Sequence, residues 1–134
     1  MELLAKVIEL DGRLLQVDRG SPAGGNERDE MCAPAILLRF DVAQVLVMGL
    51  GKQALDIRQV ESPEAVGVPL AAGSEDEPWW RVLGSPLAQL SNPEVDESGA
   101  LQAIRLQFRA DDQNPCFITM RFDTGMVRAE LSLK

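Results

Sequence analysis

The clearest pattern along the chain is an alternation of apolar and polar residues in its C-terminal third. Three runs there have a period of two, over residues 104–109, 118–122 and 127–133. This period is typical of strands that bury one face. Asp123-Thr124-Gly125 lies between the last two runs and favours a tight turn. Together these segments predict a three-stranded antiparallel meander.

Shorter strand-like runs occupy the N-terminal half. Residues 13–18 are expected to form a strand, residues 35–40 and 55–58 alternate, and residues 45–48 are apolar on both faces, as in a central strand. Residues 1–10 fit either a short helix or a strand, and Asp11-Gly12 after them favours a hairpin turn. Loops are expected where the chain is polar or rich in proline, at 19–31, 62–73 and 91–99.

A short helix is expected before the C-terminal meander. Ser74-Glu75-Asp76-Glu77 has the form of a capping box, in which serine and glutamate side chains satisfy free backbone N–H groups at a helix start. Residues 78–83 are therefore predicted to form one or two helical turns that carry Trp79 and Trp80. Gly84 is expected to end this helix.

These elements combine into a single α+β domain over residues 1–134, mainly antiparallel β-sheet meanders with about seven strands and one or two short helices. Segments 36–41 and 118–123 align without gaps and share Arg-Phe-Asp. Two meanders related by duplication explain this likeness, and so does chance similarity between amphipathic strands. The predicted core consists of Phe40, Ile104, Leu106, Phe108, Ile118, Met120, Phe122, Val127 and Leu131.

The composition narrows the possible chemistry. The chain has no histidine and no tyrosine, and its 21 acidic residues outnumber its 13 basic ones. Histidine is the usual general base near neutral pH and the commonest metal ligand, so its absence removes most hydrolase triads and most zinc or iron sites. Phosphate-binding glycine motifs and calcium loops are also missing from the sequence. We therefore expect no enzymatic activity, no metal and no cofactor.

The net charge of −8 bears on the choice of partner. It opposes binding to nucleic-acid backbones and anionic membranes and favours a basic protein partner. A charge that serves solubility alone explains the composition equally well. Oligomeric state is not indicated by the sequence.

The expected location is the cytoplasm. No apolar run reaches the roughly 18 residues that span a bilayer, and residues 1–6 do not look like a secretory signal. Cys32 and Cys116 are then expected to be reduced thiols. Their spacing fits small buried residues at the start of strands better than redox chemistry.

The adjacent tryptophans mark one candidate docking surface. Neighbouring residues on a helix point about 100° apart, so one tryptophan can seal the core while the other is partly exposed, unless both pack against the sheet. Acidic segments would surround an exposed tryptophan and attract a basic partner. The predicted partner-binding residues are Glu75, Asp76, Glu77, Trp79, Trp80, Glu27, Asp29, Glu30, Asp111 and Asp112.

The outward face of the C-terminal meander is a second candidate surface. It carries Arg105, Arg109, Arg121 and Arg128. These arginines either pair with Glu130 and with loop carboxylates on a solvated face, or they form a site for an anion or an acidic segment.

The run Pro78-Trp79-Trp80-Arg81-Val82-Leu83-Gly84-Ser85-Pro86-Leu87, with a later amphipathic strand and a hairpin at 122–125, resembles short uncharacterised bacterial proteins of the toxin-immunity type. The resemblance covers the C-terminal half and carries no catalytic residues. It implies a cytoplasmic, partner-binding role. The prediction is a non-enzymatic immunity protein that neutralises a basic bacterial toxin domain. A small-molecule sensor or carrier, and an accessory subunit of an enzyme or secretion complex, remain alternatives.

Overall fold

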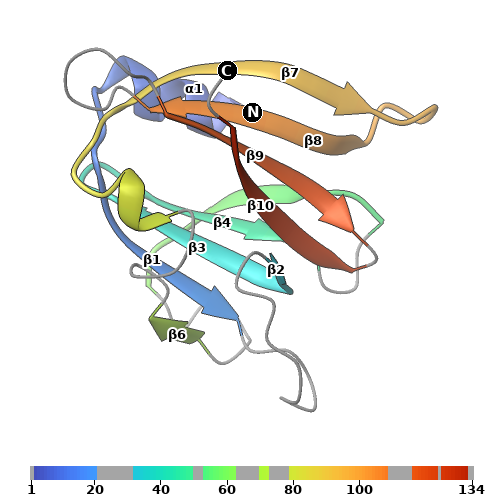
Figure 1. Ribbon diagram of the computed structural model, residues 1–134, viewed down its shortest axis with the longest axis horizontal. Coiled ribbons are helices and arrows are strands. Elements are labelled where there is room, and N and C mark those ends of the chain that lie inside the picture. Colours follow the sequence, from blue (N-terminus) through green and yellow to red (C-terminus); the bar gives the residue numbers. More distant parts are fainter. Residues whose placement is uncertain are drawn as a thin grey trace.

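The computed structural model describes residues 2–20, 32–49, 53–62, 70–72, 79–108, 116–123 and 125–132. Within these ranges the chain forms one α-helix, one 3-10 helix and two five-stranded antiparallel sheets (Figure 1). The predicted α+β class, dominated by antiparallel sheet, is confirmed. The described strands number ten, more than the seven expected, because the short strands at 32–33 and 70–72 and the irregular strand at 87–95 carry no detectable period.

The first sheet has the strand order β5-β4-β3-β1-β6. Its strands are β1 (Leu14–Gly20), β3 (Ala35–Phe40), β4 (Gln44–Met48), β5 (Asp56–Val60) and β6 (Leu70–Ala72). The apolar run at 45–48 lies between two neighbours, as predicted for an inner strand. Strand β6 corrects the prediction of a loop over 62–73, since residues 70–72 pair with the end of β1.

The second sheet has the order β2-β10-β9-β8-β7. It contains β2 (Cys32–Ala33), β7 (Leu87–Val95), β8 (Leu101–Phe108), β9 (Cys116–Asp123) and β10 (Met126–Ser132). Strands β8, β9 and β10 confirm the predicted meander. The predicted loop at 91–99 is wrong, because β7 continues to Val95. The register of β7 shifts at several points, and the strand contains Pro93 and a φ of 50° at Asn92. Because of these irregularities its residues do not alternate regularly between the two faces, so the sequence shows no strand period.

Main-chain hydrogen bonds join the two sheets at their corners. At one corner β2 of the second sheet continues through Pro34 into β3 of the first, and Gly49 N–H donates to the Pro34 carbonyl at 2.9 Å. At another corner the start of β1 pairs with the segment before β7. Leu14 N–H donates to the Ser85 carbonyl at 3.1 Å, and Gly84 N–H donates to the Leu14 carbonyl at 2.6 Å. The sheets therefore enclose one shared core.

The predicted core lies between the sheets. Phe40, Ile104, Leu106, Phe108, Ile118, Met120 and Val127 are buried there, as predicted. Phe122 and Leu131 are only partly buried and pack at the edge of this core, so their prediction as fully buried residues is wrong. Each is the last residue but one of its strand, so it lies at the rim of the sheet and not in its middle.

Helix α1 (Glu2–Glu9) packs beside the edge strands β7 and β5 (Figure 1). It buries Leu4 and Val7 in the common core. Asp11-Gly12, expected to be a hairpin turn, instead turns the chain from this helix into β1, with Asp11 at a φ of 58°. The dipeptide identifies a tight turn correctly, but it does not determine which elements the turn connects.

The two segments that share Arg-Phe-Asp occupy equivalent places in the fold. One lies in β3 and the other in β9, and each is the middle strand of its five-stranded sheet. Strand β3 pairs with β1 and β4, and β9 pairs with β8 and β10. Ile36 and Leu38 in β3, like Ile118 and Met120 in β9, point into the common core.

Candidate functional site

The two adjacent tryptophans have different surroundings. Helix η2 (Trp79–Arg81) is a single 3-10 turn, shorter than the predicted helix, and Val82 N–H donates to the Trp79 carbonyl at 3.0 Å. Trp79 is 1% exposed and belongs to the core, whereas Trp80 is 49% exposed. The structure thus selects the arrangement in which one tryptophan seals the core and the other is accessible. Trp79 is not available to a partner, which corrects its place in the predicted docking surface.

Arg81 supports the exposed indole. Its guanidinium carbon lies 4.5 Å from the centroid of the Trp80 ring, which is the geometry of a cation–π contact. The contact restrains both side chains on the surface and covers one face of the indole. A partner that reaches Trp80 therefore meets an ordered aromatic group, which loses less conformational entropy on binding than a free side chain.

Three segments that are linked through Arg13 form one end of the molecule, here called the Trp80 end. It comprises η2 and the following turn (79–85), the start of β1 with the preceding turn (10–15), and the β3–β4 turn (41–43). Arg13 N–H donates to Asp41 Oδ1 at 3.0 Å, and Arg13 Nη1 donates to the Gly84 carbonyl at 3.0 Å. These bonds fix the three segments relative to one another.

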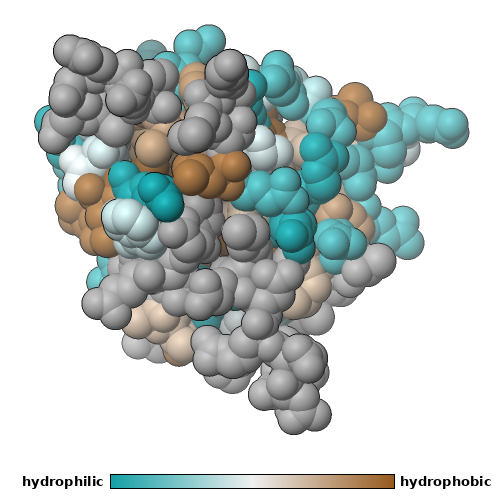
Figure 2. Space-filling model, viewed as in Figure 1, coloured by the Kyte–Doolittle hydropathy of each residue, from teal (hydrophilic) through white to brown (hydrophobic). Residues whose placement is uncertain are grey.

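Each segment of the Trp80 end exposes a large apolar side chain. Besides Trp80, these are Leu10 at 54%, Leu15 at 58% and Val42 at 40% exposure. Figure 2 shows apolar side chains, in brown, beside η2 at the left of the view. Charged side chains of Arg13, Asp41 and Arg81 lie among them. Apolar groups with a charged rim are typical of surfaces that bind proteins.

The acidic part of the predicted surface lies outside the described residues, namely Glu75, Asp76, Glu77, Glu27, Asp29, Glu30, Asp111 and Asp112. Among the predicted partner-binding residues, the structure therefore describes Trp79 and Trp80 only. Leu15 and Val42 were missed by the sequence analysis. Leu15 lies where the register of β1 shifts between Leu14 and Gln16, and Val42 lies in a turn, so neither fits a periodic pattern.

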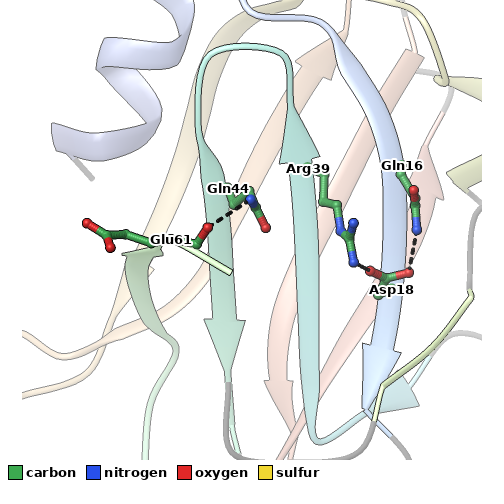
Figure 3. Close-up of polar contacts among 5 residues, drawn as sticks. All are labelled: Gln16, Asp18, Arg39, Gln44 and Glu61. Carbon is green, nitrogen blue, oxygen red and sulfur yellow. Dashed lines mark hydrogen bonds and ion pairs between the residues drawn. The ribbon is translucent and has the colours of Figure 1, made fainter. Parts of the chain in front are cut away.

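Two separate groups of polar contacts, one around the buried Asp18 and one between Gln44 and Glu61, lie on the outer face of the first sheet (Figure 3). Asp18 is 4% exposed, accepts a hydrogen bond from Gln16 Nε2 at 2.9 Å, and pairs with Arg39 Nη2 at 2.6 Å. Gln44 Nε2 donates to the main-chain carbonyl of Glu61 at 3.2 Å. A slip of one residue between β1 and β3 would move Asp18 to the opposite face from Arg39. We interpret the ion pair as a constraint on strand register.

The outer face of the second sheet carries further ion pairs. Arg121 donates to both carboxylate oxygens of Glu94, each at 3.0 Å, and Arg128 Nε lies 2.6 Å from Glu130 Oε1. The hydrogen bond from Arg121 lowers the pKa of Glu94, and the same bond raises the pKa of Arg121. The predicted pairing of outward-facing arginines with carboxylates is confirmed for Arg121 and Arg128. The partner of Arg121 was expected in a loop, but Glu94 lies in strand β7. Arg109 is outside the described residues.

The described residues offer little conventional chemistry. They contain no group of three or more histidine, cysteine or acidic side chains placed to hold a metal. Within the same residues, no helix is both long enough and apolar enough to cross a membrane. Cys32 and Cys116 are the first residues of β2 and β9, as expected, and Cys116 is half-buried with a free thiol.

Comparison with known proteins yields no matching family model and no curated protein or solved structure that meets the threshold for similarity. The interpretation of the Trp80 end therefore rests on its own geometry and chemistry.

Proposed function

We propose that the chain is a protein-binding domain that docks a partner through the Trp80 end. One observation carries this proposal: Trp80 is half open to solvent while its neighbour Trp79 is sealed in the core. An exposed indole leaves a large apolar surface in water, and burial against a partner would remove it. Tryptophan is enriched among the few residues that supply most of the binding energy at protein interfaces.

The proposed partner has a basic surface. The net charge of −8 creates a negative field that attracts such a surface over a distance and speeds encounter. Short-range burial of Trp80, Leu15 and Val42 then sets how long the complex lasts. Binding of this kind requires no catalytic group, so the proposed role is non-enzymatic.

The resemblance of the C-terminal half to toxin-immunity proteins supports a more specific proposal. The partner would be a bacterial toxin domain, and the chain would neutralise it in the cytoplasm by covering its functional surface. The acidic segments at 27–30, 75–77 and 111–112 supply the complementary charge in this proposal.

A site-specific photo-crosslinker tests the docking surface in the source cell. It is placed at Leu15 or at Val42, and at Gln59 in the exposed edge strand β5 as a matched control. We expect the same single protein to be captured from the first two positions, absent from the control, and lost when Trp80→Ala is added. Equal capture from all three positions would contradict the proposal. So would a yield of cross-linked protein that Trp80→Ala leaves unchanged.

The captured protein then tests the immunity role. Its expression alone should arrest growth, and co-expression of the wild-type chain should restore growth where the Trp80→Ala chain does not. A partner that binds through Trp80 but leaves growth unchanged refutes immunity and retains the binding role.

A further inference from the structure

The outer face of the second sheet contains a guanidinium group, that of Arg105, for which the described part of the chain provides no carboxylate partner. Arg105 in β8 lies in one cross-strand row with Ser91 of β7 and Thr119 of β9. Its guanidinium carbon is 4.0 Å from the centroid of the Phe117 ring. Among the described residues no carboxylate pairs with Arg105, and its Nε is buried without a hydrogen-bond partner.

The neighbouring arginines on this face are already neutralised. Arg121 holds Glu94, and Arg128 holds Glu130. The described arginines and carboxylates of this face are equal in number, because Asp123 also occupies an outward-facing position at the end of β9. Among the described residues, Arg105 is nevertheless the arginine of this face without a carboxylate at ion-pair distance, and a carboxylate supplied from outside would pair with it.

Stacking on Phe117 prepares Arg105 for such a carboxylate. The ring restrains the plane of the guanidinium group and shields one of its faces from water, which strengthens a hydrogen bond formed at its edge. The edge of a guanidinium group presents two parallel N–H donors that match the two oxygens of a carboxylate. The immediate row neighbours Ser91 and Thr119 are neutral hydrogen-bonding groups. Glu130, the next residue of the row beyond Thr119, is paired with Arg128.

We propose that this surface, called the Arg105 face and comprising Ser91, Arg105, Phe117 and Thr119, binds an acidic peptide segment of a partner protein. A glutamate or aspartate carboxylate of the segment lies against the donor edge of Arg105. The ion pairs beside it are open to solvent, with side-chain exposures of 43% for Arg121 and 33% for Arg128. Arginines in exposed pairs exchange partners at small cost. A segment with spaced carboxylates therefore gains further contacts along the sheet.

The proposal does not depend on the function assigned to the Trp80 end, because the two surfaces share no residue. It also requires the opposite charge in the partner. A protein that binds both surfaces would present a basic region to one and an acidic segment to the other.

Nuclear magnetic resonance of the full chain, with ¹⁵N labelling, tests the site directly, because the Nε–Hε group of Arg105 gives its own signal. The probes are an acetylated peptide of alternating glycine and glutamate, the same peptide with glutamine, acetate, and inorganic phosphate. We expect saturable shifts of Arg105 Nε–Hε and of the Thr119 amide with the glutamate peptide alone. Arg105→Gln should weaken this binding about tenfold, the loss typical of one charge-assisted bidentate contact.

Two variants control for charge and for folding. Arg58→Gln removes an equal charge from the first sheet, where the Arg58 side chain is 52% exposed, and should change the affinity less than about twofold. Arg105→Lys keeps the charge but loses the planar fork, so we expect it to restore only part of the binding. Thermal melting of each variant establishes that the fold is retained.

Several outcomes would overturn the proposal. Equal binding of the glutamine peptide would remove the role of charge, and tighter binding of phosphate would replace the peptide with a different ligand. Sedimentation tests whether the chain self-associates. If it does, and if the peptide acts only by competing with this self-association, the face binds a second copy of the chain. Absence of any saturable shift at Arg105 would leave the face without a ligand-binding role.

Discussion

At the scale of single residues, Trp79 and Trp80 show how one step along the chain separates a structural role from a surface role. The 3-10 turn directs Trp79 between the sheets and Trp80 toward solvent. Arg81 then stacks on the exposed ring. Stability and binding should therefore respond to different substitutions at these adjacent positions.

Trp79→Ala should lower the free energy of unfolding by about 3–5 kcal/mol, because it leaves a large cavity in the core. Trp80→Ala removes a half-exposed ring and one cation–π contact, so we expect a loss of about 1 kcal/mol or less. Urea denaturation followed by far-UV circular dichroism measures both values. Similar losses in the two variants would mean that Trp80 is also part of the core.

Phe108 and Phe122 form a second contrasting pair. Phe108 is fully buried, and Phe108→Ala should lower the free energy of unfolding by about 3–5 kcal/mol. Phe122 lies partly buried at the edge of the core, so Phe122→Ala should cost about half as much or less. Chemical denaturation of the two variants under the same conditions checks the order. A larger loss at Phe122 would contradict the register assigned to β9.

The sequence predicted the burial of individual side chains correctly where alternation continued over many residues. It failed where the exposure of a side chain depends on contacts with distant parts of the chain. Alternation over residues 104–108 identified the inward side chains of β8 correctly. It could not decide between Trp79 and Trp80, because their exposure depends on how η2 docks near β1. That docking is fixed by bonds such as the one from Arg13 Nη1 to the Gly84 carbonyl, 71 residues apart in sequence.

At the scale of elements, the β7–β8 hairpin combines an irregular strand with a regular one. Asp96 at its turn accepts hydrogen bonds from Ser98 Oγ at 2.7 Å and from Ala100 N–H at 3.0 Å, and these bonds lower the pKa of Asp96. Glu94 in β7 is tied across the sheet to Arg121 in β9. Both carboxylates therefore support the hairpin in their ionised form.

Acidification should weaken the contact between Glu94 and Arg121. The bond to Arg121 holds the folded-state pKa of Glu94 below its ordinary value of 4.5. Its contribution to stability is therefore present above that value and is lost as the pH falls through the lowered pKa. Glu94→Gln lacks this contribution, so its melting temperature should fall less than that of the wild type between about pH 7 and pH 2.5.

The matched control for this measurement is Glu97→Gln, which removes one charge from the hairpin turn and leaves the bond between Glu94 and Arg121 in place. Its melting temperature should follow the wild-type dependence on pH more closely than that of Glu94→Gln. If Glu94→Gln and the wild type lose the same stability on acidification, the ion pair contributes nothing in solution. Raised salt should reduce the difference between them, because the pair is exposed.

The corner between the sheets gives a second test at this scale. A Cβ atom added to Gly49 would lie 2.9 Å from both the carbonyl carbon and the oxygen of Met126, which belong to the backbone of β10. Gly49→Ala should therefore lower the melting temperature by forcing the sheets apart. At Gly12 an added Cβ meets side-chain methyl groups of Val7 and Val42 at 2.7 and 2.8 Å, and the nearest backbone atom, the Val7 carbonyl oxygen, lies farther away at 3.3 Å. Gly12→Ala is the matched control and should cost less.

The difference between elements that the sequence predicted and those that it missed has a physical basis. Strands β8, β9 and β10 each have seven or eight residues and one buried face, so their period is visible. Strand β6 has three residues, and each pairs with a residue of β1 that lies 50 or more positions earlier in the chain. In β7 the bulges interrupt the period itself. Pairing that depends on distant segments leaves no local signal.

At the scale of the whole molecule, two surfaces of different chemistry lie on one shared core. The Trp80 end exposes apolar side chains from three segments, and the Arg105 face presents a stacked guanidinium group on the outer side of the second sheet. The fold class followed from the sequence, because hydrophobic periodicity reports on which faces are buried. The composition of the docking surface did not, because the side chains that share it come from residues 10–15, 41–43 and 79–85.

Binding to the proposed basic partner should depend on charge before contact and on Trp80 after contact. Long-range attraction depends on charge, so replacing Glu75, Asp76 and Glu77 together with lysine should slow association about tenfold at low salt and weaken its salt dependence. Trp80→Ala acts only after contact, so it should speed dissociation and leave the association rate nearly unchanged. Stopped-flow mixing at about 20 and 200 mM salt separates the two effects. Arg58→Gln, which changes charge on the first sheet away from η2, should alter neither rate strongly. Unchanged kinetics in both the lysine variant and Trp80→Ala would place the docking surface elsewhere on the molecule.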